Sequence, residues 1–136
     1  MKYILLFTFL CSFLNAQAQK FANYKHGVYG NADYEHLDFS SDKQITYRYG
    51  KNGKDYHVPY LGKDGNSFKI QLPENMVVKV TINGANELIV RGVGNNYAKT
   101  YEWEYEGPVD GRGTWCQQCT QDPKEAALLI KKYYLK

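Results

Sequence analysis

The sequence contains few of the residues and motifs that reveal a function directly. Its 136 residues include only three cysteines and three histidines, and their spacing offers no set of zinc ligands. The formal net charge of +3 is too small to predict a nucleic-acid partner. No serine-hydrolase signature, complete calcium loop or phosphate-binding loop is present. The sequence therefore predicts no catalytic residue, metal or cofactor, and function has to be inferred from architecture.

Long apolar runs are also missing after the first residues. The chain begins with Lys2, an apolar stretch over residues 3–14 and the small-residue pattern Ala16-Gln17-Ala18, which are the three parts of a secretory signal peptide. The apolar stretch is shorter than the about 20 residues that span a bilayer. We expect residues 1–18 to be removed and the protein to be exported, to the periplasm or the extracellular space, without a membrane span. Residues 19–136 are expected to form one domain.

Tyrosine, in contrast, is abundant, with 13 residues in the chain. It is favoured on half-buried strands, and the clearest strand pattern covers residues 97–105. Mostly aromatic residues there alternate with small or polar ones, which predicts one packed face and one solvated face. The packed face comprises Tyr97, Lys99, Tyr101, Trp103 and Tyr105. The other face carries Glu102, Glu104 and Glu106, which predict a solvated surface or a docking surface for a basic partner.

Short strand patterns separated by turns fill the chain before residue 97. The strongest turn signals are Asn52-Gly53 and Asp64-Gly65, which favour tight hairpins. Pro59 interrupts one strand pattern and predicts a sheet edge or a bulge there, because proline cannot donate to the ladder. We predict a mainly β protein, an antiparallel meander of about eight strands that closes as a small barrel or sandwich.

The last element is predicted to be a helix over residues 122–135. Asp122 is a suitable N-cap, Pro123 suits the first helical position and Glu125 completes a capping box. An apolar stripe follows at helical spacing and includes Leu129 and Ile130. We expect this stripe to pack on the β domain.

Cys116 and Cys119 are the only cysteines left after signal-peptide cleavage, and in an oxidising compartment they are expected to form a disulfide. The run Trp115-Cys116-Gln117-Gln118-Cys119 resembles the active-site pattern of thioredoxin-like oxidoreductases. Only 17 residues follow Cys119, which excludes a thioredoxin fold. A structural disulfide and a redox-active pair both remain open.

Several segments follow one another in a recognisable order. They are Gly27-Val28-Tyr29, residues 36–42 leading into Ile45-Thr46-Tyr47, residues 86–90, and Tyr101-Glu102-Trp103. This order of strands and turns resembles an exported bacterial lipocalin-like (calycin-type) β-barrel domain. The resemblance covers roughly residues 27–106 and implies a barrel that holds a small apolar ligand.

An interior of hydroxyl-tipped rings suits a small, partly polar cavity. The candidate ligand-binding residues are Tyr47, Tyr49, Tyr56, Tyr101, Trp103 and Tyr105. The leading hypothesis is an exported, non-enzymatic binding protein that holds a small, partly apolar ligand in a β-barrel. One alternative is a periplasmic protein-binding inhibitor or immunity-type module, with a filled core and an exposed patch near residues 102–106 or 107–114. Another is a thiol–disulfide redox protein that uses Cys116 and Cys119.

Overall fold

The structure is a computed structural model that describes residues 19–50, 53–105 and 118–136. The predicted signal peptide at residues 1–18 lies outside these residues, and so does Cys116. In the part of the chain that the structure describes, no helix is long and apolar enough to cross a membrane.

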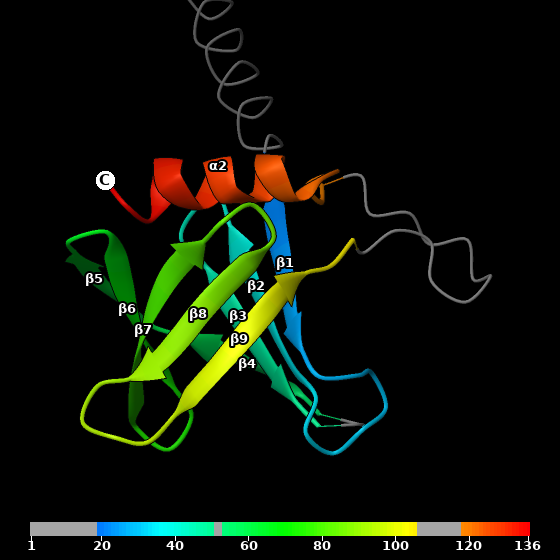
Figure 1. The fold of residues 1–136 in the computed structure, drawn as a ribbon, viewed down its shortest axis with the longest axis vertical. Coiled ribbons are helices and arrows are strands. Elements are labelled where there is room, and N and C mark those ends of the chain that lie inside the picture. Colours follow the sequence, from blue (N-terminus) through cyan, green and yellow to red (C-terminus); the bar gives the residue numbers. More distant parts are fainter. Residues whose placement is uncertain (1–18, 51–52, 106–117) are drawn as a thin grey trace, which may run out of the picture.

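A single antiparallel sheet of nine strands bends round into a nearly closed barrel (Figure 1). The strands are β1 (Phe21–His26), β2 (Glu35–Ser40), β3 (Ile45–Tyr49), β4 (Asp55–Val58), β5 (Tyr60–Asp64), β6 (Ser67–Leu72), β7 (Met76–Asn83), β8 (Glu87–Gly92) and β9 (Ala98–Trp103). Their order in the sheet is β4-β3-β2-β1-β9-β8-β7-β6-β5. The first strand therefore pairs with the last, and the predicted mainly β meander that closes on itself is confirmed.

The strand count exceeds the prediction because one strand is divided at Pro59. This residue alone separates β4, which pairs with β3, from β5, which pairs with β6. Both edges of the sheet thus belong to one bent segment. The register shifts between Tyr60 and Gly62, and the Gln71 N–H donates to the Pro59 carbonyl at 3.1 Å. The predicted irregularity at Pro59 is confirmed, and it is where the barrel nearly closes.

Alternate residues of the strands face the barrel interior, as a pleated strand requires. On β9, Tyr101 is fully buried, whereas Thr100 and Glu102 on the other face are exposed, as predicted. Each large apolar side chain buried in this way contributes roughly 1.5–3 kcal/mol. The fully buried inward side chains include Leu37, Phe39, Phe68, Ile70, Val78, Val80, Leu88 and Val90.

The C-terminal helix α2 (Pro123–Tyr133) lies across one end of the barrel (Figure 1). It begins as predicted, because the Asp122 carboxylate accepts the Glu125 N–H at 2.7 Å. The Glu125 carboxylate in turn accepts the Gln121 N–H at 3.1 Å. Leu129 and Ile130 are buried, so the predicted packing of the apolar stripe is also confirmed.

Tyr134, the residue after α2, fills this end of the barrel. Its ring centroid lies 5.2 Å from that of Phe68 and 5.6 Å from that of Phe39. Its hydroxyl donates to the Ser40 carbonyl at 2.6 Å, and its carbonyl accepts the Tyr60 hydroxyl at 2.8 Å. We call this the closed end of the barrel.

The segment that leads into α2 is attached to β1. The Phe21 N–H donates to the Gln118 carbonyl at 2.8 Å, and the Thr120 N–H donates to the Phe21 carbonyl at 2.9 Å. Cys119 lies between these contacts and is buried. Because Cys116 lies outside the described residues, its pairing with Cys119 stays a prediction.

Candidate ligand-binding site

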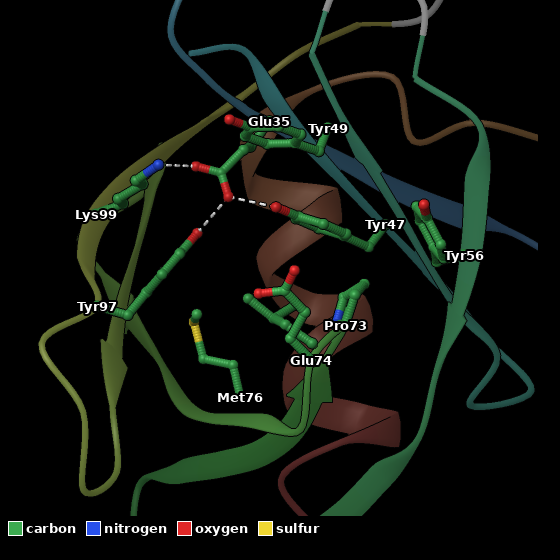
Figure 2. Close-up of a pocket in the computed structure, with 10 residues that line it drawn as sticks. Glu35, Tyr47, Tyr49, Tyr56, Pro73, Glu74, Met76, Tyr97 and Lys99 are labelled. Carbon is green, nitrogen blue, oxygen red and sulfur yellow. Dashed lines mark hydrogen bonds and ion pairs between the residues drawn. The ribbon is translucent and has the colours of Figure 1, made fainter. Parts of the chain in front are cut away.

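A pocket of about 410 Å³ lies at the end of the barrel away from α2, which we call the open end (Figure 2). The direction of β2 shows this arrangement: its last residue, Ser40, contacts Tyr134, and its first residue, Glu35, lines the pocket. The lining residues come from both halves of the sheet. They are Glu35, Tyr47, Tyr49, Tyr56, Leu72, Pro73, Glu74, Met76, Tyr97 and Lys99.

The Glu35 carboxylate is the centre of the polar contacts in this pocket, although its side chain is only 2 % exposed. One oxygen, Oε1, accepts the Tyr47 hydroxyl at 2.5 Å and the Tyr97 hydroxyl at 2.9 Å. The other oxygen, Oε2, accepts a hydrogen bond from the Lys99 ammonium. A buried carboxylate is tolerated only when it is paired and hydrogen-bonded. Figure 2 shows how these three donors converge on it.

The strand register explains why an acidic residue points inward. Glu35 shares its side of β2 with Leu37 and Phe39, which are fully buried in the core. Lys99 lies near the start of β9, two residues before the buried Tyr101, and therefore also faces inward. The pairing of β1 with both β2 and β9 brings these strands to the same side of the barrel.

The turn before β9 fixes the position of Tyr97. The Asn95 side chain accepts the Tyr97 N–H at 3.0 Å and donates to the Val77 carbonyl at 3.0 Å. The Tyr97 carbonyl accepts the Gly92 N–H at 2.6 Å. These bonds hold the Tyr97 ring beside Glu35, where the Lys99 ammonium lies 5.3 Å from the ring centroid. The polar side of the pocket is therefore held in place by hydrogen bonds within the protein.

The hydroxyl groups form a short chain behind the carboxylate. The Tyr97 and Tyr101 oxygens are 2.6 Å apart, and because Tyr97 gives its proton to Glu35, Tyr101 is the donor to Tyr97. Burial raises the pKa of the Tyr47 hydroxyl far above its usual range, and Glu35 raises it further. Burial also raises the pKa values of Tyr97 and Tyr101, although the bond between them partly offsets this rise for Tyr97. The hydroxyls thus remain protonated donors at neutral pH.

Apart from Glu74, the rest of the pocket lining is apolar or aromatic. Leu72, Pro73 and Met76 come from the end of β6, the following turn and the start of β7. Tyr49 and Tyr56 contribute rings at the mouth and are 54 % and 38 % exposed. The arrangement can hold a small molecule between an apolar side, tyrosine rings and a fixed polar cluster.

The structure brings together three of the six tyrosine and tryptophan residues that the sequence analysis named. Tyr47, Tyr49 and Tyr56 line the pocket. Tyr101 does not line it but is hydrogen-bonded to Tyr97, which does. Trp103 lies at the other end of β9, where its indole N–H donates to Thr120 Oγ1 at 3.3 Å.

Tyr105, the last of the six, stacks near Trp103 and is also outside the pocket. The two ring centroids are 6.3 Å apart. Tyr105 follows β9 and is half-buried. Trp103 and Tyr105 therefore share the packed face of the strand pattern but lie toward the end of the barrel that α2 covers.

Sequence reasoning did not name Glu35 or Lys99 as site residues. Lys99 is two residues before Tyr101, on the face that the sequence predicts to be packed, and Glu35 is two residues before the apolar Leu37. That spacing was the available signal. The spacing alone does not predict a buried Glu35, because a charged side chain is rarely buried unless it is paired.

A second buried polar cluster lies on the opposite face of β2. His36 is only 1 % exposed, its Nδ1 is 2.9 Å from the Tyr34 hydroxyl and its Nε2 is 2.6 Å from Asp38 Oδ1. This cluster is separated from the pocket by the sheet. Among the residues that the structure describes, no group of three or more histidine, cysteine, aspartate or glutamate side chains is placed to hold a metal ion.

Comparison with known proteins identifies no relative: no family model, no curated protein and no solved structure matches the chain. The lipocalin-like resemblance therefore stays a prediction. Function has to be inferred from the pocket itself.

Proposed function

We propose that this is a non-enzymatic binding protein that holds a small, partly apolar ligand at the open end of its barrel. The observation that carries the proposal is the pocket of about 410 Å³ beside the Glu35 cluster. Its volume falls within the roughly 300–1,000 Å³ typical of small-molecule sites. If the predicted signal peptide at residues 1–18 is removed on export, this binding takes place in the periplasm or the extracellular space.

The composition of the pocket supports binding of a molecule with unlike sides. Leu72, Pro73 and Met76 offer an apolar wall, whereas Lys99 and the tyrosine hydroxyls offer fixed polar groups. Because Glu35 holds its donors in place, little side-chain freedom is lost when a ligand enters. A preorganised site of this kind is favourable for specific binding.

The experiment is native mass spectrometry of the protein expressed from the full-length chain and purified without reducing agent. We expect an additional mass that disappears on denaturation. The variant Met76→Trp places a large ring in the pocket and should abolish the additional mass. Thr100→Trp is the matched control, because Thr100 is exposed on the outer face of β9, and it should retain the ligand. Retention in Met76→Trp as well would place the ligand elsewhere and contradict the proposal.

The other two predicted functions remain predictions. The protein-binding alternative uses a patch near residues 102–106 or 107–114, and residues 106–114 of it lie outside the described residues. The redox alternative uses Cys116, which also lies outside them. Cys119 itself is buried beside β1.

A further inference from the structure

Acidic residues outnumber basic residues in the described lining of the pocket. From this we infer that the pocket selects a small organic cation, an amine attached to a short apolar body. The inference rests on the proposed function, since it specifies the ligand of the same pocket. The charged residues in the lining are Glu35, Glu74 and Lys99. Two carboxylates and one ammonium leave one net negative charge on the walls of the pocket.

The two carboxylates are in different situations. Glu35 is buried and receives three donors, including the Lys99 ammonium, which is the only ammonium among the described residues of the lining. Glu74 is exposed at the mouth, and no hydrogen bond or ion pair to its carboxylate exists among the residues that the structure describes. Figure 2 shows Glu74 extending from the turn between β6 and β7 toward the middle of the pocket. The unbalanced charge is therefore that of Glu74.

An anionic ligand fits this pocket poorly. To bind an anion, the Lys99 ammonium would have to turn away from Glu35 or be shared with it. Glu35 is almost fully buried, so loss of its cationic partner would leave an uncompensated charge in the interior. The anion would in addition lie near Glu74. Both effects oppose anion binding, whereas a cation pairs with Glu74 and leaves the bond between Glu35 and Lys99 intact.

Aromatic rings favour the same ligand class. Four tyrosines, Tyr47, Tyr49, Tyr56 and Tyr97, line the pocket. A cation within about 6 Å of a ring centroid is attracted by the ring face. Lys99 lies 5.3 Å from the Tyr97 centroid and Lys54 lies 5.5 Å from the Tyr56 centroid, so these two rings already have a cation beside them. The rings left for the ammonium of a ligand are those of Tyr47 and Tyr49. The ammonium of a ligand can thus approach a ring and Glu74, with its apolar body against Leu72, Pro73 and Met76.

The backbone at the mouth holds Glu74 in an unusual conformation. Its φ of 69° and that of Asn75, 60°, lie in the left-handed region, which favours glycine. The Gln71 side-chain amide donates to Asn75 Oδ1 at 2.9 Å and supports the turn. Strained residues are often found at binding sites, where surrounding structure holds them in place. Here the strained turn presents the carboxylate of Glu74 to the pocket.

The test compares three probes that share a phenyl ring and a two-carbon linker: 2-phenylethylamine, 2-phenylethanol and 3-phenylpropionate. Each is titrated calorimetrically at pH 7 into the protein expressed from the full-length chain. We expect the amine to bind roughly tenfold more tightly than the alcohol, because it gains an ion pair and a ring contact. The propionate should bind most weakly of the three.

The variant Glu74→Gln removes the ion pair but not the ring contact, so it should abolish most of the advantage of the amine over the alcohol and leave the affinity for the alcohol unchanged. Glu102→Gln is the matched control, because Glu102 is an exposed carboxylate on the outer face of β9. If the alcohol binds but the amine has no advantage, or if Glu74→Gln preserves that advantage, cation selection is wrong and the proposed function stands. If no probe binds and native mass spectrometry shows a bare protein, the proposed function fails as well.

Discussion

The two ends of the barrel are both rich in tyrosine, but their hydroxyl groups bind different partners. At the closed end, the Tyr134 hydroxyl donates to the Ser40 carbonyl and the Tyr60 hydroxyl to the Tyr134 carbonyl. At the open end, the hydroxyls of Tyr47 and Tyr97 donate to the carboxylate of Glu35. Neutral backbone acceptors complete a packed core, whereas a carboxylate introduces a charge that the interior must compensate.

The different hydrogen-bond acceptors indicate different roles for the two ends of the barrel. The rings at the closed end stack on one another, with the Tyr60 and Phe68 centroids 5.9 Å apart and the Tyr60 and Tyr134 centroids 5.6 Å apart. Such packing stabilises the fold. A buried ion pair is often no more stabilising than apolar residues of similar volume. The charged cluster beside the pocket therefore supports the proposed binding function more than it supports a purely stabilising role.

The largest effect is expected from emptying the closed end with Tyr134→Ala. The substitution removes a fully buried ring and its bond to Ser40, which should lower the free energy of unfolding by about 4 kcal/mol. Urea unfolding followed by circular dichroism measures this loss. The control Tyr134→Phe keeps the ring and should cost only about 1 kcal/mol for the lost hydrogen bond, because the Ser40 carbonyl still accepts the Lys43 N–H at 3.2 Å. A loss below about 1 kcal/mol in Tyr134→Ala would mean that α2 and its cap do not close the barrel.

A smaller loss is expected at the open end from Lys99→Met, which removes the cationic partner of Glu35. We expect about 2 kcal/mol, below the usual cost of breaking a buried pair, because the Lys99 side chain is 29 % exposed and two hydroxyls still donate to Glu35. The double variant Glu35→Gln with Lys99→Met should be more stable than Lys99→Met alone. Losses that simply add in this cycle would show that the two side chains are not coupled.

The closed end was the more predictable of the two. The capping residues Asp122 and Glu125 and the stripe that includes Ile130 are local patterns, and the structure contains them as expected. Tyr134 is an exception, because it enters the core only after the helix has ended. Local periodicity could not show that the residue beyond α2 turns inward.

The open end depends on contacts that local patterns do not reveal. Glu35 and Lys99 are far apart in the chain and on strands that are separated in the sheet by β1. The alternation of residues along each strand can predict which side of the sheet these two side chains face. It cannot predict that they form an ion pair, because this depends on the register of β2, β1 and β9. Trp103 illustrates the same limit: it lies on the predicted face of β9, yet its position along the strand places it away from the pocket.

The smallest effect is a dependence on alkaline pH, which should be stronger at the open end. Burial raises the pKa values of Tyr47, Tyr97 and Tyr101 there, and at the closed end it raises those of Tyr60 and Tyr134. The folded state therefore retains protons that the unfolded chain releases above its tyrosine pKa of about 10. The stabilisation is fully present below that pH and is lost as the pH rises toward the folded-state values.

Each such tyrosine should lower the free energy of unfolding by up to about 1.4 kcal/mol per pH unit above pH 10. The variant Tyr97→Phe has one fewer of these groups, so its stability should decline less steeply by about that amount between pH 10 and 11.5. Urea unfolding at closely spaced pH values measures the slope, and tyrosinate absorbance checks the ionisation. Because the slope is a difference between pH values, it is separate from the cost of losing the bond to Glu35 at neutral pH. An unchanged slope would mean that Tyr97 ionises as readily in the folded as in the unfolded protein, and that water reaches the polar cluster of the open end.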